Sequence, residues 1–88
     1  MKKIKNIHPG EILQEEFLAE YNITAYKLAK NTYIPATRIS QIVKGKRSIS
    51  ADTALRFSKY FGTTPDFWMG LQIEYDLREE LNIKAKMI

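Results

Sequence analysis

A short polar stretch near the middle of the chain carries side chains that suit hydrogen bonding to nucleic-acid bases. Arg38 can donate two hydrogen bonds to O6 and N7 of guanine, and Gln41 can bond N6 and N7 of adenine. Ala36 and Thr37 are small enough to contact a thymine methyl group. A helix would present these four residues on neighbouring turns. The spacing therefore predicts a surface that reads base edges.

A basic turn follows directly. Lys44, Lys46 and Arg47 surround Gly45, where the helix carrying the base-reading residues is expected to end. Lysine and arginine there suit contacts with phosphate oxygens, which position a protein on a duplex without reading its sequence. A short basic loop between helices can also be ordinary solvent-exposed surface. Its place directly after a polar helix favours phosphate binding.

Helix start and stop signals occur along the whole chain. They are prolines suited to first helical positions (Pro9, Pro35, Pro65), N-cap hydroxyls (Thr24, Ser50) and terminal glycines (Gly45, Gly62). These signals predict five helices, over residues 9–21, 25–31, 35–44, 51–61 and 65–81, with fraying in 82–88. The links leave no room for a sheet. We therefore expect a single all-α, five-helix domain over residues 1–88.

Apolar spacing indicates which faces are buried. Leu13, Phe17 and Tyr21 recur every four residues, which predicts one apolar face along the first helix. The second and third helices are joined by only three or four residues, so they must cross steeply, as in a helix-turn-helix. Ala29 leaves room for the close approach that this crossing requires, and Ile39 lies on the inward side of the third helix.

Composition excludes most enzymatic and metal chemistry. Cysteine is absent and His8 is the single histidine, so disulfides, thiolate chemistry and His/Cys metal clusters are excluded. Adjacent glutamates such as Glu15 and Glu16 diverge by about 100° on a helix, so they cannot form an acid–base pair. No apolar run approaches the ~20 residues that span a bilayer. We expect a cytoplasmic protein without catalytic residues, cofactor, metal or membrane contact.

Charge is distributed in blocks along the 88 residues, whose formal net charge is +4. Residues 24–61 carry eight Lys or Arg against one Asp, a charge of +7. Residues 9–23 carry four Glu and no base, a charge of −4. Residues 62–81 carry five acids against one Arg, also −4. A basic centre between acidic flanks predicts a polyanion-binding surface and a separate surface for another partner, although solvated helix faces would give the same pattern.

Three stretches of the sequence form a combined pattern: HPGEIL at 8–13, LAKNTYIPATRISQIVKGKRSISADTALRFSKYFG at 28–62 and TPDFWMGLQIEYDL at 64–77. Together they resemble the HigA antitoxin branch of the lambda repressor/Cro-like (XRE) helix-turn-helix family. The resemblance implies a lambda-repressor-like, all-helical homodimer that binds an inverted-repeat operator in its own promoter. It also implies a partner, a small basic RelE-like mRNA-cleaving toxin that the protein neutralises.

The resemblance assigns roles to individual positions. The family's base-reading residues match Ala36, Thr37, Arg38 and Gln41. Its phosphate contacts match Thr24, Lys44, Lys46 and Arg47. Its core-closing and dimer-pairing helix matches Phe67, Trp68, Leu71 and Tyr75. The turn departs from the family pattern, because Tyr33 stands where the family usually has a glycine with positive φ.

Two questions stay open at the level of the sequence. Glu15, Glu16 and Glu20 could face the basic toxin, or they could form an ordinary solvated helix surface. The chain could also be a stand-alone XRE-type transcriptional regulator without a toxin partner. A reading frame for a basic protein of ~90–100 residues beside the gene would favour the antitoxin.

Overall fold

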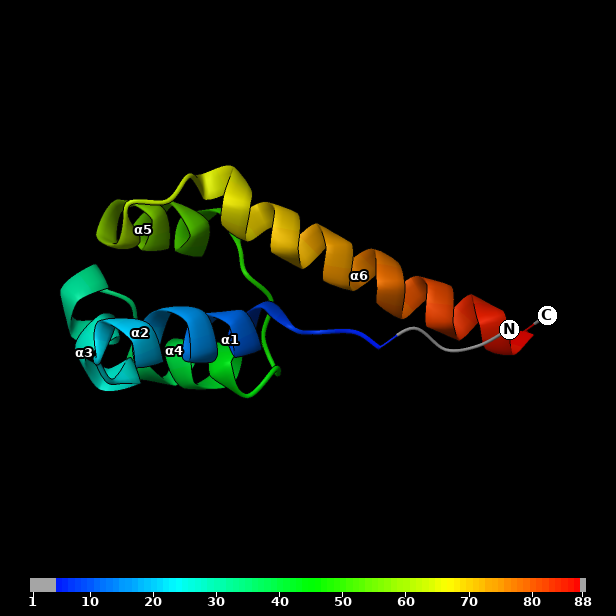
Figure 1. The fold of residues 1–88 in the computed structure, drawn as a ribbon, viewed down its shortest axis with the longest axis horizontal. Helices are drawn as coiled ribbons and strands as arrows, with labels where there is room; N and C mark the ends of the chain where they lie inside the picture. Colours follow the sequence, from blue (N-terminus) through cyan, green and yellow to red (C-terminus); the bar gives the residue numbers. More distant parts are fainter. Residues whose placement is uncertain (1–4, 88) are drawn as a thin grey trace.

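Five helical segments follow one another in the computed structural model, which describes the backbone of residues 5–87 and the side chains of residues 5–85 (Figure 1). The first segment consists of α1 (Pro9–Ile12), η1 (Leu13–Leu18) and α2 (Ala19–Tyr21) without a break. The others are α3 (Ala25–Thr32), α4 (Ala36–Val43), α5 (Ala51–Phe61) and α6 (Pro65–Met87). No strand occurs within residues 5–87, and the predicted all-α class is confirmed.

A π-helical turn, η1, occupies the middle of the first segment. Its backbone hydrogen bonds join residues five apart, as between the N–H of Ala19 and the carbonyl of Gln14. Leu13 and Leu18, also five apart, are the buried side chains of η1. The predicted face with four-residue spacing is therefore wrong at Tyr21, whose side chain is 48% exposed, because the wider turn changes which residues point inward.

Side-chain caps determine where the helices begin. The hydroxyl of Thr24 accepts from the N–H of Lys27 at 3.1 Å, and that of Ser50 accepts from the N–H of Thr53 at 3.3 Å. Both caps were predicted, because each satisfies an N–H group that has no partner within the helix. Pro35 differs from the prediction. Its extended ψ of 138° makes it the N-cap of α4 rather than the first helical residue.

The sequence predicts the end of α5 correctly but not the end of α6. Gly62 adopts φ 76° and ends α5 where expected. By contrast, α6 does not end at 81 as predicted but continues to Met87. The chain before α1 packs along this helix, and the side chain of Asn6 donates to the carbonyl of Tyr75 at 2.8 Å. This tertiary contact ties the chain before α1 to the middle of α6.

The core is a cluster of apolar side chains around Trp68, which is fully buried. The rings of Phe17 and Phe57 lie 4.8 and 5.1 Å from the Trp68 ring, centroid to centroid. The indole N–H donates to the hydroxyl of Thr63 at 2.8 Å, so its one polar group is satisfied. The cluster comprises Leu13, Leu18, Leu28, Ala29, Ile34, Ile39, Ile42, Ile49, Ala54, Phe57, Phe61 and Trp68.

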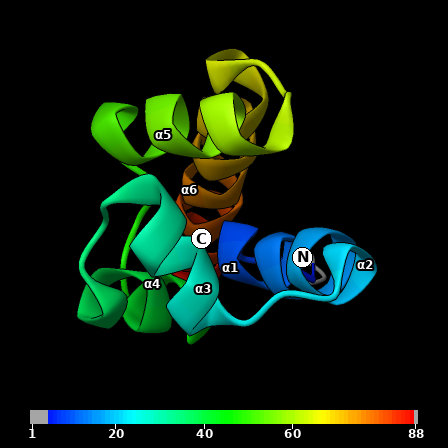
Figure 2. The same cartoon turned by 90° about the vertical axis from the view of Figure 1, so that its left-hand side faces the viewer.

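Helix α6 gives the molecule its elongated shape of 46 × 21 × 20 Å. Its first turns pack on α5, and its remainder projects away from the other helices, with residues 5–8 alongside (Figure 1). Seen from the end, α3 and α4 lie together below α5, with the first helical segment to one side (Figure 2). The helix-turn-helix pair is therefore at the opposite end of the molecule from the tip of α6.

Candidate nucleic-acid interface

Helices α3 and α4 form the predicted helix-turn-helix, joined by residues 33–35. Ala29 on α3 is 5% exposed and Ile39 on α4 is fully buried, as expected for closely packed helices. Tyr33 adopts the left-handed conformation, with φ 59° and ψ 32°. Its N–H and that of Ile34 both donate to the carbonyl of Ala29. The turn thus keeps the geometry that glycine usually provides, and the conformational cost at Tyr33 is tolerated.

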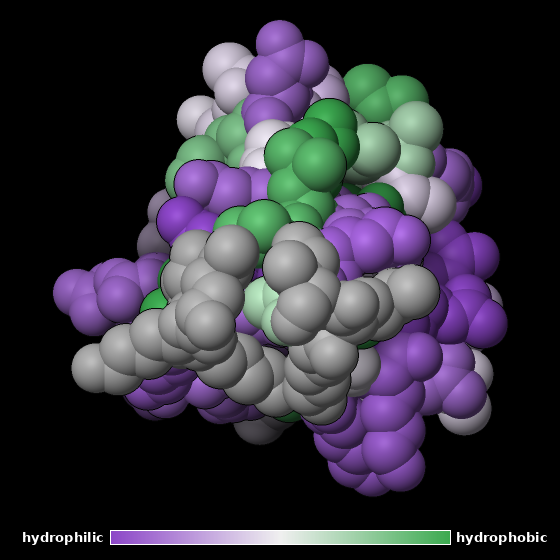
Figure 3. All heavy atoms as spheres, turned by 90° about the vertical axis from the view of Figure 1, so that its right-hand side faces the viewer, coloured by the Kyte–Doolittle hydropathy of each residue, from purple (hydrophilic) through white to green (hydrophobic). Residues whose placement is uncertain are grey.

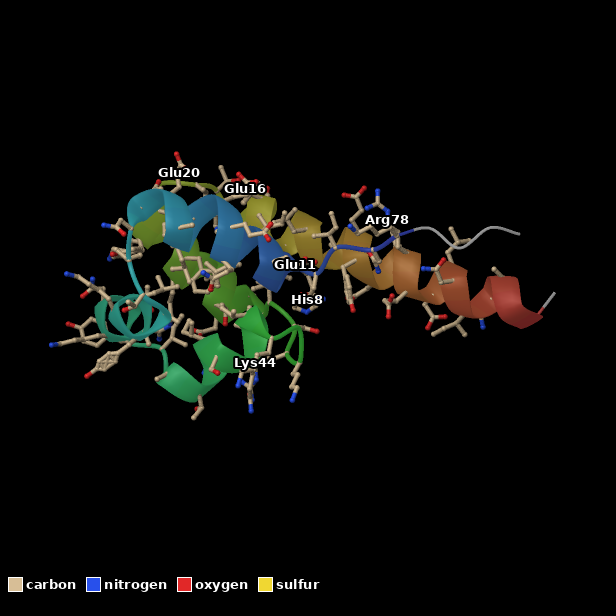
Figure 4. The ribbon with its side chains drawn as sticks, turned by 60° about the horizontal axis from the view of Figure 1, so that its bottom comes forward. His8, Glu11, Glu16, Glu20, Lys44 and Arg78 are labelled. Carbon is tan, nitrogen blue, oxygen red and sulfur yellow. The ribbon has the colours of Figure 1, made fainter. Side chains whose placement is uncertain are left out.

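The outer surface of α4 carries the four expected base-reading residues. Ala36, Thr37 and Gln41 are exposed, whereas Arg38 is half-buried. Lys44, which ends α4, points away from the body of the molecule (Figure 4). Small or polar side chains on an exposed helix, bounded by a basic residue, form a surface that can enter a major groove.

Arg38 is held by a carboxylate from the neighbouring helix. Its Nη1 atom lies 2.9 Å from Oδ2 of Asp52, in the first turn of α5. Arg56 donates from Nε to both oxygens of the same carboxylate, at 3.1 and 3.2 Å. The hydrogen bonds from Arg56 and then from Arg38 hold the pKa of Asp52 below its usual value. This carboxylate therefore stays ionised at neutral pH.

From the sequence alone, Asp52 stands out only as the single acid of the basic block. The four-residue spacing to Arg56 is a local signal for one of its two ion pairs. The pair with Arg38 has no such signal, because the two residues lie fourteen positions apart and meet only through the packing of α4 and α5.

The basic turn after α4 is ordered by hydrogen bonds that its backbone N–H groups and the one just after it donate. The N–H of Lys46 donates to the carbonyl of Gln41 at 2.8 Å. The buried N–H of Ile49 donates to the side-chain oxygen of Gln72 on α6, also at 2.8 Å. The predicted phosphate-binding side chains of this turn are all exposed, namely Lys44, Lys46 and Arg47. A turn anchored at both ends thus presents three cations beside the surface of α4.

Thr24, the fourth expected phosphate contact, lies at the other end of the helix-turn-helix. It is exposed, and its hydroxyl already caps α3. Lys27, Lys30 and Asn31 share a shallow groove with it. Both lysines were counted in the basic block but not singled out. Lys27 lies in the first turn of α3, where backbone N–H groups also attract anions, and Lys30 lies in the last turn.

Comparisons with known proteins identify the family. A helix-turn-helix family profile matches residues 14–68. The antitoxin HigA of Pseudomonas aeruginosa, solved with the higBA promoter, superposes with a TM-score of 0.90 at 43% identity, covering 94% of this chain and 90% of that one. Antitoxin HigA-1 of Vibrio cholerae is 31% identical over 84 residues, covering 93% of this chain and 79% of that protein. The chain belongs to the HigA branch of the XRE-type helix-turn-helix family.

A third relative extends the comparison beyond proteins named as antitoxins. Virulence-associated protein I of Dichelobacter nodosus is 47% identical over 72 residues, which cover 82% of this chain and 67% of that relative. The chain spans about two thirds of the length of the first curated relatives that it matches. The family predicted from the three sequence stretches is confirmed.

In this HigA-family chain, the residues expected for core closure or dimer pairing divide into two groups. Trp68 is fully buried in the core, and Tyr75 packs edge-on against His8, with ring centroids 4.7 Å apart. Leu71 is half-buried against the core, and Phe67 is 39% exposed. The aromatic residues thus mainly close this chain's own core. The strongly exposed apolar side chains of α6 are Ile73, Leu77 and Ile83.

In this HigA-family chain, the acidic residues predicted to face a toxin lie on the first helical segment. Glu15, Glu16 and Glu20 are exposed, and none forms an ion pair with another described residue. Glu16 and Glu20 lie at the opposite edge of the molecule from Lys44 (Figure 4). Glu16 and Glu20 therefore do not cover Lys44, so this part of the acidic surface and the basic turn are both accessible.

Within the described residues, no group of three His, Cys, Asp or Glu side chains is arranged to hold a metal ion. No described helix is both long and apolar enough to cross a bilayer. His8, the single histidine, is not at the surface but 8% exposed, where it caps α1 through Nδ1. Its role in this structure is therefore to begin the first helix.

Proposed function

We propose that this HigA-family protein is a sequence-specific DNA-binding antitoxin that represses its own operon and neutralises a RelE-like mRNA-cleaving toxin. The observation that carries the DNA-binding part is the exposed surface of α4, formed by Thr37 and Gln41 and followed directly by an ordered basic turn. The likeness to an antitoxin solved with its promoter supports the same part. No step of this function requires catalysis.

The DNA contacts divide into two kinds. Gln41, Arg38 and the small residues Ala36 and Thr37 read base edges in the major groove. Contacts to phosphate come from Thr24 at the start of α3 and from the basic turn after α4. Base contacts determine which DNA sequence is bound, whereas phosphate contacts only position the protein on the duplex. Mutations in the two sets therefore have different effects on binding. The phosphate-binding residues are Thr24, Lys44, Lys46 and Arg47.

Mobility-shift titrations on the DNA upstream of the protein's own gene, at two salt concentrations, test this division. Gln41→Ala should change the preference at one base pair by about 1–3 kcal/mol. Lys46→Ala should weaken binding to every sequence alike and make the salt dependence shallower. Lys84→Ala, an equal charge change near the far end of α6, should do neither. Identical behaviour of the first two variants would refute the base-reading assignment.

The active form in this proposal is a homodimer that places two α4 helices about 34 Å apart on an inverted repeat. Phe67 and the exposed apolar residues of α6, including Leu77, supply the surface for pairing, because a monomer would leave them in water. Leu77→Glu should yield a monomer in sedimentation equilibrium. Leu55→Glu, at a similarly exposed leucine on α5, should remain a dimer.

Toxin capture is the second activity in the proposal, and the acidic side chains of the first helical segment are its candidate surface. A small basic protein would be attracted to Glu15, Glu16 and Glu20, which have no cationic partner among the described residues. Co-expression with the adjacent reading frame, followed by pull-down, should recover the toxin. Glu15/Glu16→Lys should abolish recovery, whereas Glu79/Glu80→Lys on α6 makes the same charge change and should not.

A stand-alone transcriptional regulator is the alternative that this experiment distinguishes. It shares the DNA contacts and the dimer but has no toxin partner. Failure to recover any partner from the adjacent reading frame, together with retained DNA binding, would favour the regulator.

A further inference from the structure

The carboxylate of Asp52 connects three helices of the DNA-binding end. It accepts from Arg38 on α4 at 2.9 Å and from Arg56 on α5 at 3.1 Å. Arg56 in turn donates from Nη1 to the carbonyl of Thr32, the last residue of α3, at 3.0 Å. The guanidinium of Arg38 is therefore attached to a network that also includes the end of its helix-turn-helix partner.

Asp52 lies in the first turn of α5, where a negative charge is favourable for the helix, but that role needs no contact with Arg38. The Asp52 side chain is 55% exposed, and ion pairs this accessible to solvent contribute little to folding. Asp52 is also the one acid among residues 24–61, which carry eight Lys or Arg. A lone carboxylate in such a block repels phosphate, so it weakens binding to all DNA. The contact that neither helix formation nor DNA affinity requires is the one between Asp52 and Arg38.

We propose that Asp52 is a positioning residue for sequence recognition: it fixes the guanidinium of Arg38 so that this side chain reads a base rather than a phosphate. The inference rests on the proposed base-reading role of Arg38. Arginine has five N–H donors, and the one given to Asp52 leaves enough for a two-bond contact with guanine. Fixing the guanidinium before binding also removes rotamer freedom that an unrestrained arginine would lose on the DNA.

The residues around Arg38 and Asp52 affect whether Arg38 binds a base or a phosphate. Arg38 and Asp52 line one groove together with Arg47 of the basic turn. A phosphate attracted by Arg47 would also attract a free Arg38, and phosphate contacts carry no sequence information. The carboxylate in the same groove opposes that contact. Asp52 therefore lowers affinity for unrelated DNA and preserves the preference for the operator.

The test compares two isosteric variants that each remove one negative charge. Asp52→Asn removes the carboxylate on Arg38, and Glu74→Gln removes the one that pairs with Arg78 on α6 at 3.1 Å. Binding of the full-length protein to its operator duplex and to a scrambled duplex of the same composition is measured by fluorescence anisotropy. Asp52→Asn should bind the scrambled duplex several-fold more tightly and lose about tenfold in the operator-to-scrambled ratio. Glu74→Gln should leave that ratio unchanged.

A double-variant cycle separates this inference from the proposed function. In an Arg38→Ala background, Asp52→Asn should no longer change the ratio, because no guanidinium remains to be positioned. If Arg38→Ala alone leaves base preference unchanged, the base-reading role fails and the inference fails with it. If Arg38→Ala changes base preference but Asp52→Asn keeps the wild-type ratio, only the inference is overturned. Circular dichroism melts of each variant establish that the compared proteins are folded.

Discussion

The Nδ1 atom of His8 accepts a hydrogen bond from the N–H of Gly10 at 2.9 Å, and this bond begins the first helix. Only a neutral imidazole can accept at Nδ1. Burial lowers the pKa of His8, while the charges of Asp76 and Glu11 oppose that shift. The ring also packs against Tyr75. The folded protein thus favours the neutral form through both geometry and burial.

Stability should therefore fall in mild acid. Because the folded-state pKa of His8 lies below its ordinary value of 6.5, the unfolded chain binds a proton first as the pH falls. The contribution of neutral His8 is complete above pH 6.5 and decreases below it, by at most about 1.4 kcal/mol per pH unit. Urea unfolding at pH 7.5, 6.5 and 5.5 measures the effect. His8→Asn, which keeps a capping acceptor without titrating, should remove most of this dependence.

Gly10 should not tolerate a side chain. A Cβ at this position would overlap the carbonyl oxygen of Ile42 on α4, so α1 and α4 would have to separate. Gly10→Ala should therefore destabilise the fold by about 1–3 kcal/mol or more, as overpacking does. Gly70→Ala on α6 is the matched control, since nothing lies near its Cβ position, and it should add about 0.5–1 kcal/mol. Equal effects in chemical denaturation would contradict the contact.

Local signals predicted the helices well, and tertiary contacts account for what they missed. Ser50 and Gly62 bound α5 where the sequence placed its ends, because a cap and a left-handed glycine act within one turn. The π-helical turn at Leu13–Leu18 has no such local signature. A 3.6-residue period correctly places Leu13 and Phe17 toward the core but wrongly places Tyr21 there. The packing of residues 5–8 along α6, by contrast, joins segments about seventy residues apart in sequence, which no local signal encodes.

The candidate site shows the same division. Residue types and spacing on one helix sufficed to select Thr37 and Gln41, because an exposed helical surface follows from the helix itself. The attachment of Arg38 to Asp52 depends on how α4 and α5 pack, which no short-range pattern encodes. The sequence thus predicted which side chains α4 exposes. The structure adds that one of them, Arg38, is held in place by Asp52.

Tyr33 should be replaceable by glycine with a gain in stability. Its φ of 59° costs a side-chain-bearing residue about 1–2 kcal/mol. Tyr33 as a whole is 86% exposed, so little packing is lost when its side chain is removed. Glycine also makes the unfolded chain more flexible, and this lowers the stability of the folded state by about 0.4–1 kcal/mol. Tyr33→Gly should therefore stabilise by up to about 1 kcal/mol in urea titrations.

The reverse change at Gly62 is the matched control for Tyr33. Gly62 has φ 76° with nothing near its Cβ position, so Gly62→Ala changes backbone conformational strain alone. It should destabilise by about 1–2 kcal/mol. A loss of stability in Tyr33→Gly, alongside the expected loss in Gly62→Ala, would show that the tyrosine ring contributes contacts that outweigh its strain.

Gln72 should affect DNA binding although it lies in the core. Its side-chain oxygen accepts from the buried N–H of Ile49, which anchors the end of the basic turn, and its amide donates to Asp76 at 2.9 Å. Gln72→Leu leaves the Ile49 N–H without an acceptor, at a cost of about 1–3 kcal/mol. A loosened turn should then weaken binding to operator and scrambled duplexes equally, because phosphate contacts do not discriminate. Asp76→Ala at pH 8 keeps the Ile49 bond and should bind both duplexes like the wild type. Wild-type affinity in a folded Gln72→Leu protein would show that the turn is positioned without this hydrogen bond.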